Sequence, residues 1–140
     1  MTLSKTEIKK YTKLTDEWID NVIVKKSPAL VTKMFSKNGI LLGTVSKQIR
    51  EGKDIKCYFK FFVNLPSLDV IYKKYKINEI SNNVYVNNAF ITFSYNNNKK
   101  KEIIKTRITF IFKSNKIFLL HSSELPDLNK KLISTCPKTI

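Results

Sequence analysis

The second half of this 140-residue chain contains four consecutive segments in which apolar and polar residues alternate, and this pattern constrains the fold more than any other feature. The segments span 70–80, 84–95, 102–113 and 116–122, and short clusters of Asn, Ser and Lys separate them. Alternation with a period of two is typical of β-strands, and such polar clusters are typical of tight turns. Strands joined by turns this short pair in antiparallel order. We therefore predict an antiparallel meander over 70–122.

The first 63 residues carry helical patterns instead. Apolar residues recur every three or four positions over 4–24, and Ser4 followed by Glu7 has the spacing of a capping box. Ser27 and Pro28 predict the start of a second, short helix that continues through Met34 and Phe35. Residues 53–63 predict a third helix, which follows a turn at Glu51-Gly52 and ends before Pro66.

One strand is expected between the second and third helices, in the run ILLGTVS at 40–46. Asn38-Gly39 is expected to end the preceding helix, and Gly43 to form a bend or bulge. Helices followed by an antiparallel sheet predict an α+β domain in which a curved sheet wraps the helices. We assign this domain to residues 1–127 and interpret 128–140 as a basic tail.

The chain is strongly basic, with 26 Lys and Arg against 11 Asp and Glu, a net charge of +15. Only Arg50 and Arg107 are arginines, whereas proteins that read nucleic-acid sequence use arginine for bidentate contacts with bases. An AT-rich coding sequence, as in some large DNA viruses and protists, would also produce this excess of Lys, Asn and Ile. Two interpretations therefore stay open: compositional drift with nonspecific affinity for polyanions, and dedicated nucleic-acid recognition.

The two cysteines, Cys57 and Cys136, are far apart and have no metal-type spacing, so we expect free thiols. One histidine and two distant cysteines make no metal site, and no cofactor is expected. The N-terminus lacks the apolar core of a signal peptide, and no run is long enough to span a membrane. These features predict a cytoplasmic protein in a reducing environment, with a virus particle as the other location considered.

Arg107 and His121, the only histidine, lie inside apolar strand-like runs. Alternation puts Arg107, Thr109 and Ile111 on one face of their strand and predicts that Ile108, Phe110 and Phe112 are buried on the other. On the last strand the same rule places Ile117, Leu119, His121 and Ser123 together. A hairpin at Ser114-Asn115 would then bring Arg107 and His121 toward the same end of the sheet, with direct contact depending on register.

Several sequence motifs match a known family. They are FSKNGILLGTVSKQIREGKDIKCYFKFF, the strand RITFIF and the ending HSSELP. Together with the order of elements over residues 10–127, they resemble the NTF2-like superfamily. Within it they are most similar to the SnoaL-like branch that contains the association domain of calcium/calmodulin-dependent protein kinase II. The resemblance implies a cone in which a strongly bent antiparallel sheet encloses a cavity closed by N-terminal helices, and a homodimer or larger homo-oligomer formed through the sheet.

The chain departs from the family pattern at the last strand. Relatives usually carry more than one histidine there, where this chain has Leu119-Leu120-His121, and commonly a tryptophan before it, where this chain has Ile117-Phe118. These losses weigh against an inherited catalytic activity and leave the scaffold intact.

The resemblance implies a ligand pocket in which donors from Arg107 and His121 crown an apolar cavity and hold a carboxylate or another small anion. The residues assigned to this pocket are Arg107, His121, Ser123, Thr109, Trp18 and Tyr58. A structural alternative is that Arg107 pairs with an acidic residue of the first helix and that His121 only satisfies backbone carbonyls. The acidic candidates are Asp16, Glu17 and Asp20. In either case a buried Arg107 requires a partner, because an unpaired buried charge costs several kcal/mol.

Three functions follow from these features. The first is a non-enzymatic association module whose cavity binds a small anionic or polar ligand. The second is a basic accessory protein that binds nucleic acid or another polyanion, supported by the lysines around Tyr72 and Tyr75. The third is a SnoaL-like isomerase or cyclase, which would need a carboxylate in the cavity, and the later strands offer Glu79 and Glu102 near turns. A serine nucleophile at Ser122 or Ser123 lacks a glycine-rich elbow.

Overall fold

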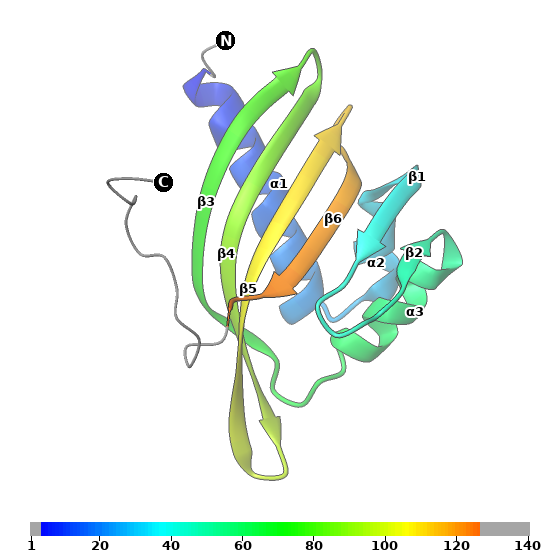
Figure 1. Cartoon of the computed structure of the whole chain (residues 1–140), viewed down its shortest axis with the longest axis vertical. Helices are drawn as coiled ribbons and strands as arrows, with labels where there is room; N and C mark the ends of the chain where they lie inside the picture. The colour runs from blue at the N-terminus through cyan, green and yellow to red at the C-terminus, as the bar shows by residue number, and fades with distance from the viewer. Residues whose placement is uncertain (1–3, 127–140) are drawn as a thin grey trace, which may run out of the picture.

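The computed structural model describes residues 4–126, in which three helices pack against one face of a six-stranded sheet (Figure 1). Strands β3, β4 and β5 lie in front of α1 in this view, and α3 lies beside β1 and β2. The predicted α+β fold class is confirmed. The elements are α1 (Lys5–Ile23), α2 (Pro28–Lys33), β1 (Phe35–Leu42), β2 (Ile49–Glu51), α3 (Lys53–Phe62), β3 (Asp69–Ser81), β4 (Val84–Asn97), β5 (Lys100–Lys113) and β6 (Lys116–Glu124).

The sheet has the strand order β2-β1-β6-β5-β4-β3. Strands β3 to β6 form the predicted antiparallel meander. The predicted antiparallel sheet has one exception, because β1 pairs with β6 in parallel. Parallel partners need a long connection, and here α3 and four strands separate the two along the chain. The sheet is therefore mixed.

Tight turns fix the register of the meander. Asn98 and Lys99 join β4 to β5 with φ of 49° and 70°, and Ser114 and Asn115 join β5 to β6 with φ of 50° and 66°. Two consecutive residues with positive φ match the right-handed twist of the flanking strands. The alternation of the later strands is thereby held in phase from one strand to the next.

Local capping places the helices as the sequence predicts. The Ser4 side chain accepts a hydrogen bond from the Glu7 backbone N–H at 3.1 Å, and the Ser27 side chain accepts one from Leu30 at 3.1 Å. Gly52, with φ of 53°, immediately precedes α3. The two serine caps satisfy backbone donors that have no partner inside the helix, whereas Gly52 makes no side-chain cap.

The region between α2 and α3 differs from the prediction. Strand β1 begins at Phe35 rather than at residue 40, so Asn38-Gly39 lies inside a strand whose pairing with β6 is irregular between Phe35 and Ile40. A Cβ on Gly39 would lie 2.9 Å from the Ile117 carbonyl oxygen, so this glycine permits a close approach of two strands. The three-residue β2 was not predicted, because it is too short to show a period.

Inward-facing strand residues and the helices share one core. Phe110 and Phe112 are buried as predicted and stack at 6.0 Å between ring centroids, and Trp18 meets Phe110 edge to face at 5.3 Å. Cys57 is an exposed free thiol on α3, whereas Cys136 and the predicted 128–140 tail lie outside the described residues. None of the helices within 4–126 is both long enough and apolar enough to cross a membrane.

Candidate functional site

The concave side of the sheet, which faces the helices, is filled by aromatic side chains. The space left at its centre measures about 10 Å³, and a single water needs roughly 10–15 Å³. Trp18 and Tyr58 line this space and are 3% and 6% exposed. A cavity of this size holds no organic ligand.

Tyr58 is the tyrosine that lines this central space. Its ring stacks on Phe62 at 5.8 Å, and the Arg50 guanidinium lies 5.8 Å from the ring centroid. Burial raises the pKa of Tyr58 to about 12, although a backbone hydrogen bond at Val45 and the charge of Arg50 act in the opposite direction. The phenol is therefore neutral near pH 7.

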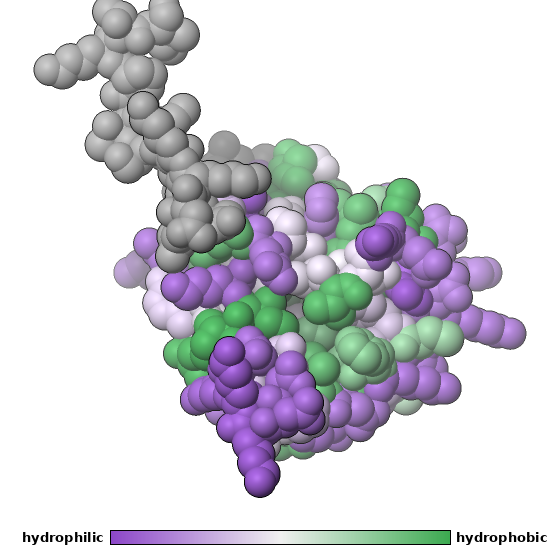
Figure 2. Space-filling model, turned by 60° about the horizontal axis from the view of Figure 1, so that its bottom comes forward, coloured by the Kyte–Doolittle hydropathy of each residue, from purple (hydrophilic) through white to green (hydrophobic). Residues whose placement is uncertain are grey.

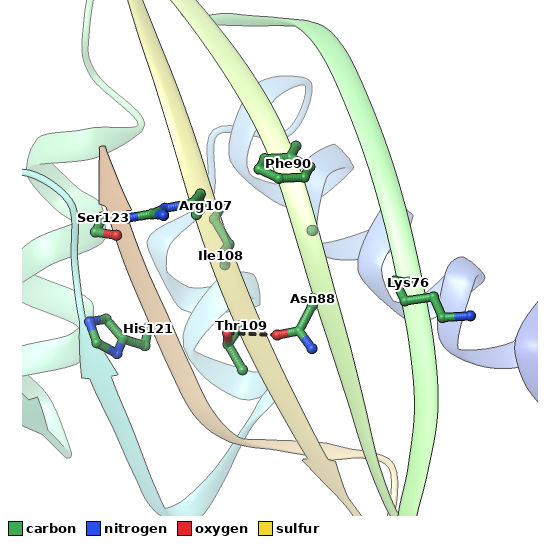
Figure 3. Close-up of a pocket in the computed structure, with 9 residues that line it drawn as sticks. Lys76, Asn88, Phe90, Arg107, Ile108, Thr109, His121 and Ser123 are labelled. Carbon is green, nitrogen blue, oxygen red and sulfur yellow. Dashed lines mark hydrogen bonds between the residues drawn. The ribbon is translucent and has the colours of Figure 1, made fainter. Parts of the chain in front are cut away.

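The opposite, outer face of the sheet carries a groove of about 400 Å³ (Figure 3). In Figure 3, Arg107 reaches toward Ser123 on the neighbouring strand, and Asn88 faces Thr109. The Thr109 hydroxyl donates to the Asn88 side-chain oxygen at 2.9 Å. The groove is lined by Lys76, Asn88, Ala89, Phe90, Arg107, Ile108, Thr109, His121 and Ser123.

The six predicted pocket residues therefore divide between the two faces. Arg107, Thr109, His121 and Ser123 lie together in the outer groove, whereas Trp18 and Tyr58 lie in the interior. Alternation correctly put the four strand residues on one side, but that side faces away from the helices. The expectation that Arg107 and His121 crown a cavity closed by the N-terminal helices is wrong in its geometry, because Ile108, Phe110 and Phe112 occupy the helix-facing side.

Two further expectations about Arg107 are wrong for the same reason. Its side chain is exposed to water, so it needs no buried counter-charge. Arg107 also cannot pair with the first helix, because that helix lies on the other side of the sheet. Asp16 of α1 instead accepts hydrogen bonds from the Lys73 ammonium group and the Tyr75 hydroxyl, each at 2.7 Å from its Oδ1 atom. Within residues 4–126, neither Arg107 nor His121 has a side-chain hydrogen bond or ion pair.

Ile117 also departs from the predicted face. It is buried, while Phe118 is 38% exposed and Leu119 is partly buried. The pairing of β5 with β6 shifts between Ile111 and Phe112, and this bulge reverses the alternation at the start of β6.

Strand register arranges the outer face in rows that run across the sheet. The row nearest the β5–β6 turn is apolar and crosses four strands, and we call it the apolar row. It consists of Ile40, Leu119, Ile111 and Val86.

Three further rows follow along the strands, and we call them the basic rows. The first is Leu42, His121, Thr109, Asn88 and Lys76; the second is Ser123, Arg107, Phe90 and Lys74; the third is Lys105, Thr92 and Tyr72. Four members are Lys or Arg, and none is Asp or Glu. Lys76, Asn88 and Phe90 were missed as groove residues, although counting outward from the turns could have placed them.

Tyr75, which was grouped with Tyr72 as a possible polyanion contact, faces the helices. Its hydroxyl donates to Asp16, and burial together with this hydrogen bond raises the pKa of Tyr75. Tyr72 is on the outer face and 53% exposed. Only Tyr72 of the pair is therefore available on the basic rows.

Residues 4–126 contain no group of three or more His, Cys, Asp and Glu side chains placed to hold a metal ion. No carboxylate lines either the interior space or the outer groove within this part of the chain. The chemistry that these two sites offer is hydrogen-bond donation, positive charge and apolar contact.

No family model and no curated protein matches the sequence. Solved structures do match. One is described as a calcium/calmodulin-dependent protein kinase II association domain from Xanthomonas campestris; it is 25% identical, with a TM-score of 0.74 over 84% of this chain and 87% of that chain. A scytalone dehydratase-like protein from Novosphingobium aromaticivorans is 9% identical, with a TM-score of 0.74 over 96% of this chain and 95% of that chain.

A third solved structure is the hub homology domain of the same kinase from Chlamydomonas reinhardtii. It is 11% identical, with a TM-score of 0.65 over 85% of this chain and 98% of that chain. The class defined by these matches is the NTF2-like superfamily, and the chain has its fold. Within that class the neighbours include both association domains and enzyme-like proteins.

Proposed function

We propose that the protein is a non-enzymatic association module that pairs with a second copy of itself through the outer face of the sheet. The observation that carries this proposal is the apolar row, which crosses four strands on a face that none of the helices within residues 4–126 covers. Phe118 and Val84 extend the apolar surface toward the β5–β6 turn, and Phe118 is 38% exposed. The four members of the row are each partly buried, and a partly exposed apolar stripe on an uncovered sheet face is a candidate for a protein–protein contact.

A two-fold contact centred on the apolar row keeps the basic rows of the two copies apart, with Lys113 and Lys116 bordering the apolar row on its other side. Such a contact places each row member against the same row of the partner copy. The basic rows of the two copies would then lie on either side of the contact rather than against each other. Full overlap of the two sheets would bring Lys74, Lys76 and Arg107 close to like charges, which is costly.

Two similar structures support association over catalysis, because their descriptions name an association domain and a hub domain. Other neighbours are described as a scytalone dehydratase and an epoxide hydrolase/cyclase-like enzyme, so an isomerase or cyclase is the competing candidate. Proton transfer of that kind uses a positioned acid or base. The interior of this protein has about 10 Å³ of space, too little for a substrate, so we favour association.

Sedimentation velocity at micromolar concentration tests the proposal. We expect the wild-type chain to sediment as a dimer or larger assembly, and Ile111→Lys with Leu119→Lys to weaken self-association about 100-fold or more, because each lysine would be desolvated in the contact. Ile8→Lys is the matched control, since Ile8 is 41% exposed on α1 and lies away from the sheet's outer face. A wild-type monomer, or an assembly unaffected by the double variant, would contradict the proposal.

A further inference from the structure

The basic rows form a second surface on the outer face, distinct from the apolar row. Their register places Lys74, Phe90 and Arg107 side by side on three adjacent strands. The next row places Tyr72 beside Thr92 and Lys105. Tyr72 and Phe90 are therefore diagonal neighbours on adjacent strands, and aromatic side chains reach one another at that spacing.

Both aromatic rings are available to a partner. Phe90 is 44% exposed and Tyr72 is 53% exposed. The hollow that Phe90 lines with Arg107 and Lys76 measures about 400 Å³, and a second hollow of about 370 Å³ is lined by Phe90, Tyr72 and Lys105. Because Phe90 lines both, the two hollows are neighbours on the sheet, and we call the pair the track. Figure 2, which brings the lower end of Figure 1 forward, shows hydrophobic side chains exposed between hydrophilic ones.

The charge on this track has one sign. Lys74, Lys76, Lys105 and Arg107 lie on the basic rows, which contain no Asp or Glu. The described carboxylates of the same strands lie outside the rows: Glu79, Glu102 and Glu124 alternate with the outward residues. Asp69 lines a groove with Asp16 and Asp20 of α1, and Tyr72 borders that groove on its other side. An anionic partner would meet these four cations without a repelling carboxylate in the rows.

We propose that the basic rows bind single-stranded nucleic acid. Aromatic rings exposed along a positively charged groove are the features by which proteins bind single strands: bases stack on the rings, and Lys and Arg neutralise the phosphates. A duplex cannot use Tyr72 and Phe90 in this way, because its bases are already stacked. An acidic protein would use the cations but would gain less from two flat rings aligned with them. Binding of this kind is sequence-tolerant, which agrees with a chain whose cations are mostly lysine.

Fluorescence anisotropy with labelled oligodeoxythymidine of about 20 nucleotides tests this inference on the full chain. Phe90→Ala and Tyr72→Ala should each weaken binding on the order of ten-fold, since each removes one stacking platform. Phe90→Trp should retain binding. Phe61→Ala is the control, because Phe61 is 61% exposed on α3, on the helix side of the sheet. Thermal unfolding of each variant verifies that it is folded.

Charge variants test the electrostatic part. The double variant Lys76→Glu with Arg107→Glu should weaken binding strongly. It should also make the plot of log affinity against log salt concentration less steep by about 1.4, because each of the two lost phosphate contacts contributes roughly 0.7 to the slope. Lys13→Glu with Lys56→Glu makes the same change in net charge on exposed positions of α1 and α3 and should have a much smaller effect.

Three outcomes would overturn the inference. One is equal loss in the two charge pairs, which would mean that binding follows net charge alone. Another is affinity for duplex DNA that equals the single-strand affinity and does not depend on Phe90 and Tyr72. The third is tighter binding of polyglutamate, which would identify an acidic protein as the partner. Each result is independent of self-association, because the variants leave the apolar row intact.

Discussion

Gly43 lies against the ring of Tyr58, and this arrangement yields a prediction with a defined magnitude. A Cβ on Gly43 would lie 2.3 Å from two carbon atoms of the Tyr58 ring, whereas carbon atoms in contact are separated by about 3.5–4.0 Å. Tyr58 is 6% exposed and stacked on Phe62, so its ring cannot move aside. We expect Gly43→Ala to lower the free energy of unfolding by about 3 kcal/mol, the upper end for overpacking.

Removing the ring should relieve this clash. Tyr58→Ala alone should cost about 3–5 kcal/mol, as other large-to-small changes in cores do. In the double variant Gly43→Ala with Tyr58→Ala, the added methyl group has room. The loss of unfolding free energy in the double variant should therefore be about 2–3 kcal/mol smaller than the sum of the two single losses. Urea unfolding followed by the fluorescence of Trp18, the only tryptophan and 3% exposed, measures all four proteins.

Gly52 provides the control for this cycle. A Cβ there would meet nothing within 4 Å, and its φ of 53° means that Gly52→Ala costs only local backbone strain. Its cost should add to that of Tyr58→Ala. If the losses from Gly43→Ala and Tyr58→Ala instead add within about 0.5 kcal/mol, the conclusion that side chains fill this interior is refuted. The question of a ligand cavity there would then be open again.

Two further predictions concern buried polar groups. The pKa of Tyr58 is raised from a usual value of 10 to about 12 in the folded state, so its contribution to stability is complete below pH 10 and is lost as pH rises toward 12. The unfolding free energy of the wild type should therefore fall by about 3 kcal/mol more than that of Tyr58→Phe between pH 10 and 12, as measured by urea unfolding. Thr15→Val should cost about 1–3 kcal/mol in the same assay, because the buried Asn87 amide donates to the Thr15 hydroxyl at 2.9 Å and would lose its acceptor.

Each of these has a result that would count against it. Parallel pH curves for wild type and Tyr58→Phe between pH 10 and 12 would mean that the phenol ionises as easily folded as unfolded. For the second, Thr15→Ser serves as the control because it keeps the hydroxyl; a loss from Thr15→Ser as large as that from Thr15→Val would attribute the effect to packing.

The meander and the helices could be predicted because their signals are local. Strong alternation and the turn residues at 98–99 and 114–115 define β3 to β6, and Ser4 and Ser27 define the helix starts. The start of β1 could not be placed in this way, because Asn38-Gly39 is typical of a turn but lies inside the strand, where the pairing with β6 is irregular. β2 is too short to show a period.

The sequence predicted which residues of the candidate site lie together, but not which side of the sheet they lie on. Alternation assigns residues to one face or the other, and it grouped Arg107, Thr109, His121 and Ser123 correctly. It does not say which face the helices cover. The family resemblance implied an open cone, and the bulky interior of this chain, with Trp18, Tyr58 and several phenylalanines, leaves almost no space inside it.

The parallel pairing of β1 with β6 also affects the order in which the chain can fold. Leu41, fully buried, pairs with Leu120, so an early strand obtains its neighbour only after nearly all of the described chain has been made. Contacts this distant in sequence slow folding, and until they form, the β1–β2 ribbon presents an open edge to other nascent chains. During synthesis, the meander can assemble locally, while closure of the sheet waits for its last strand.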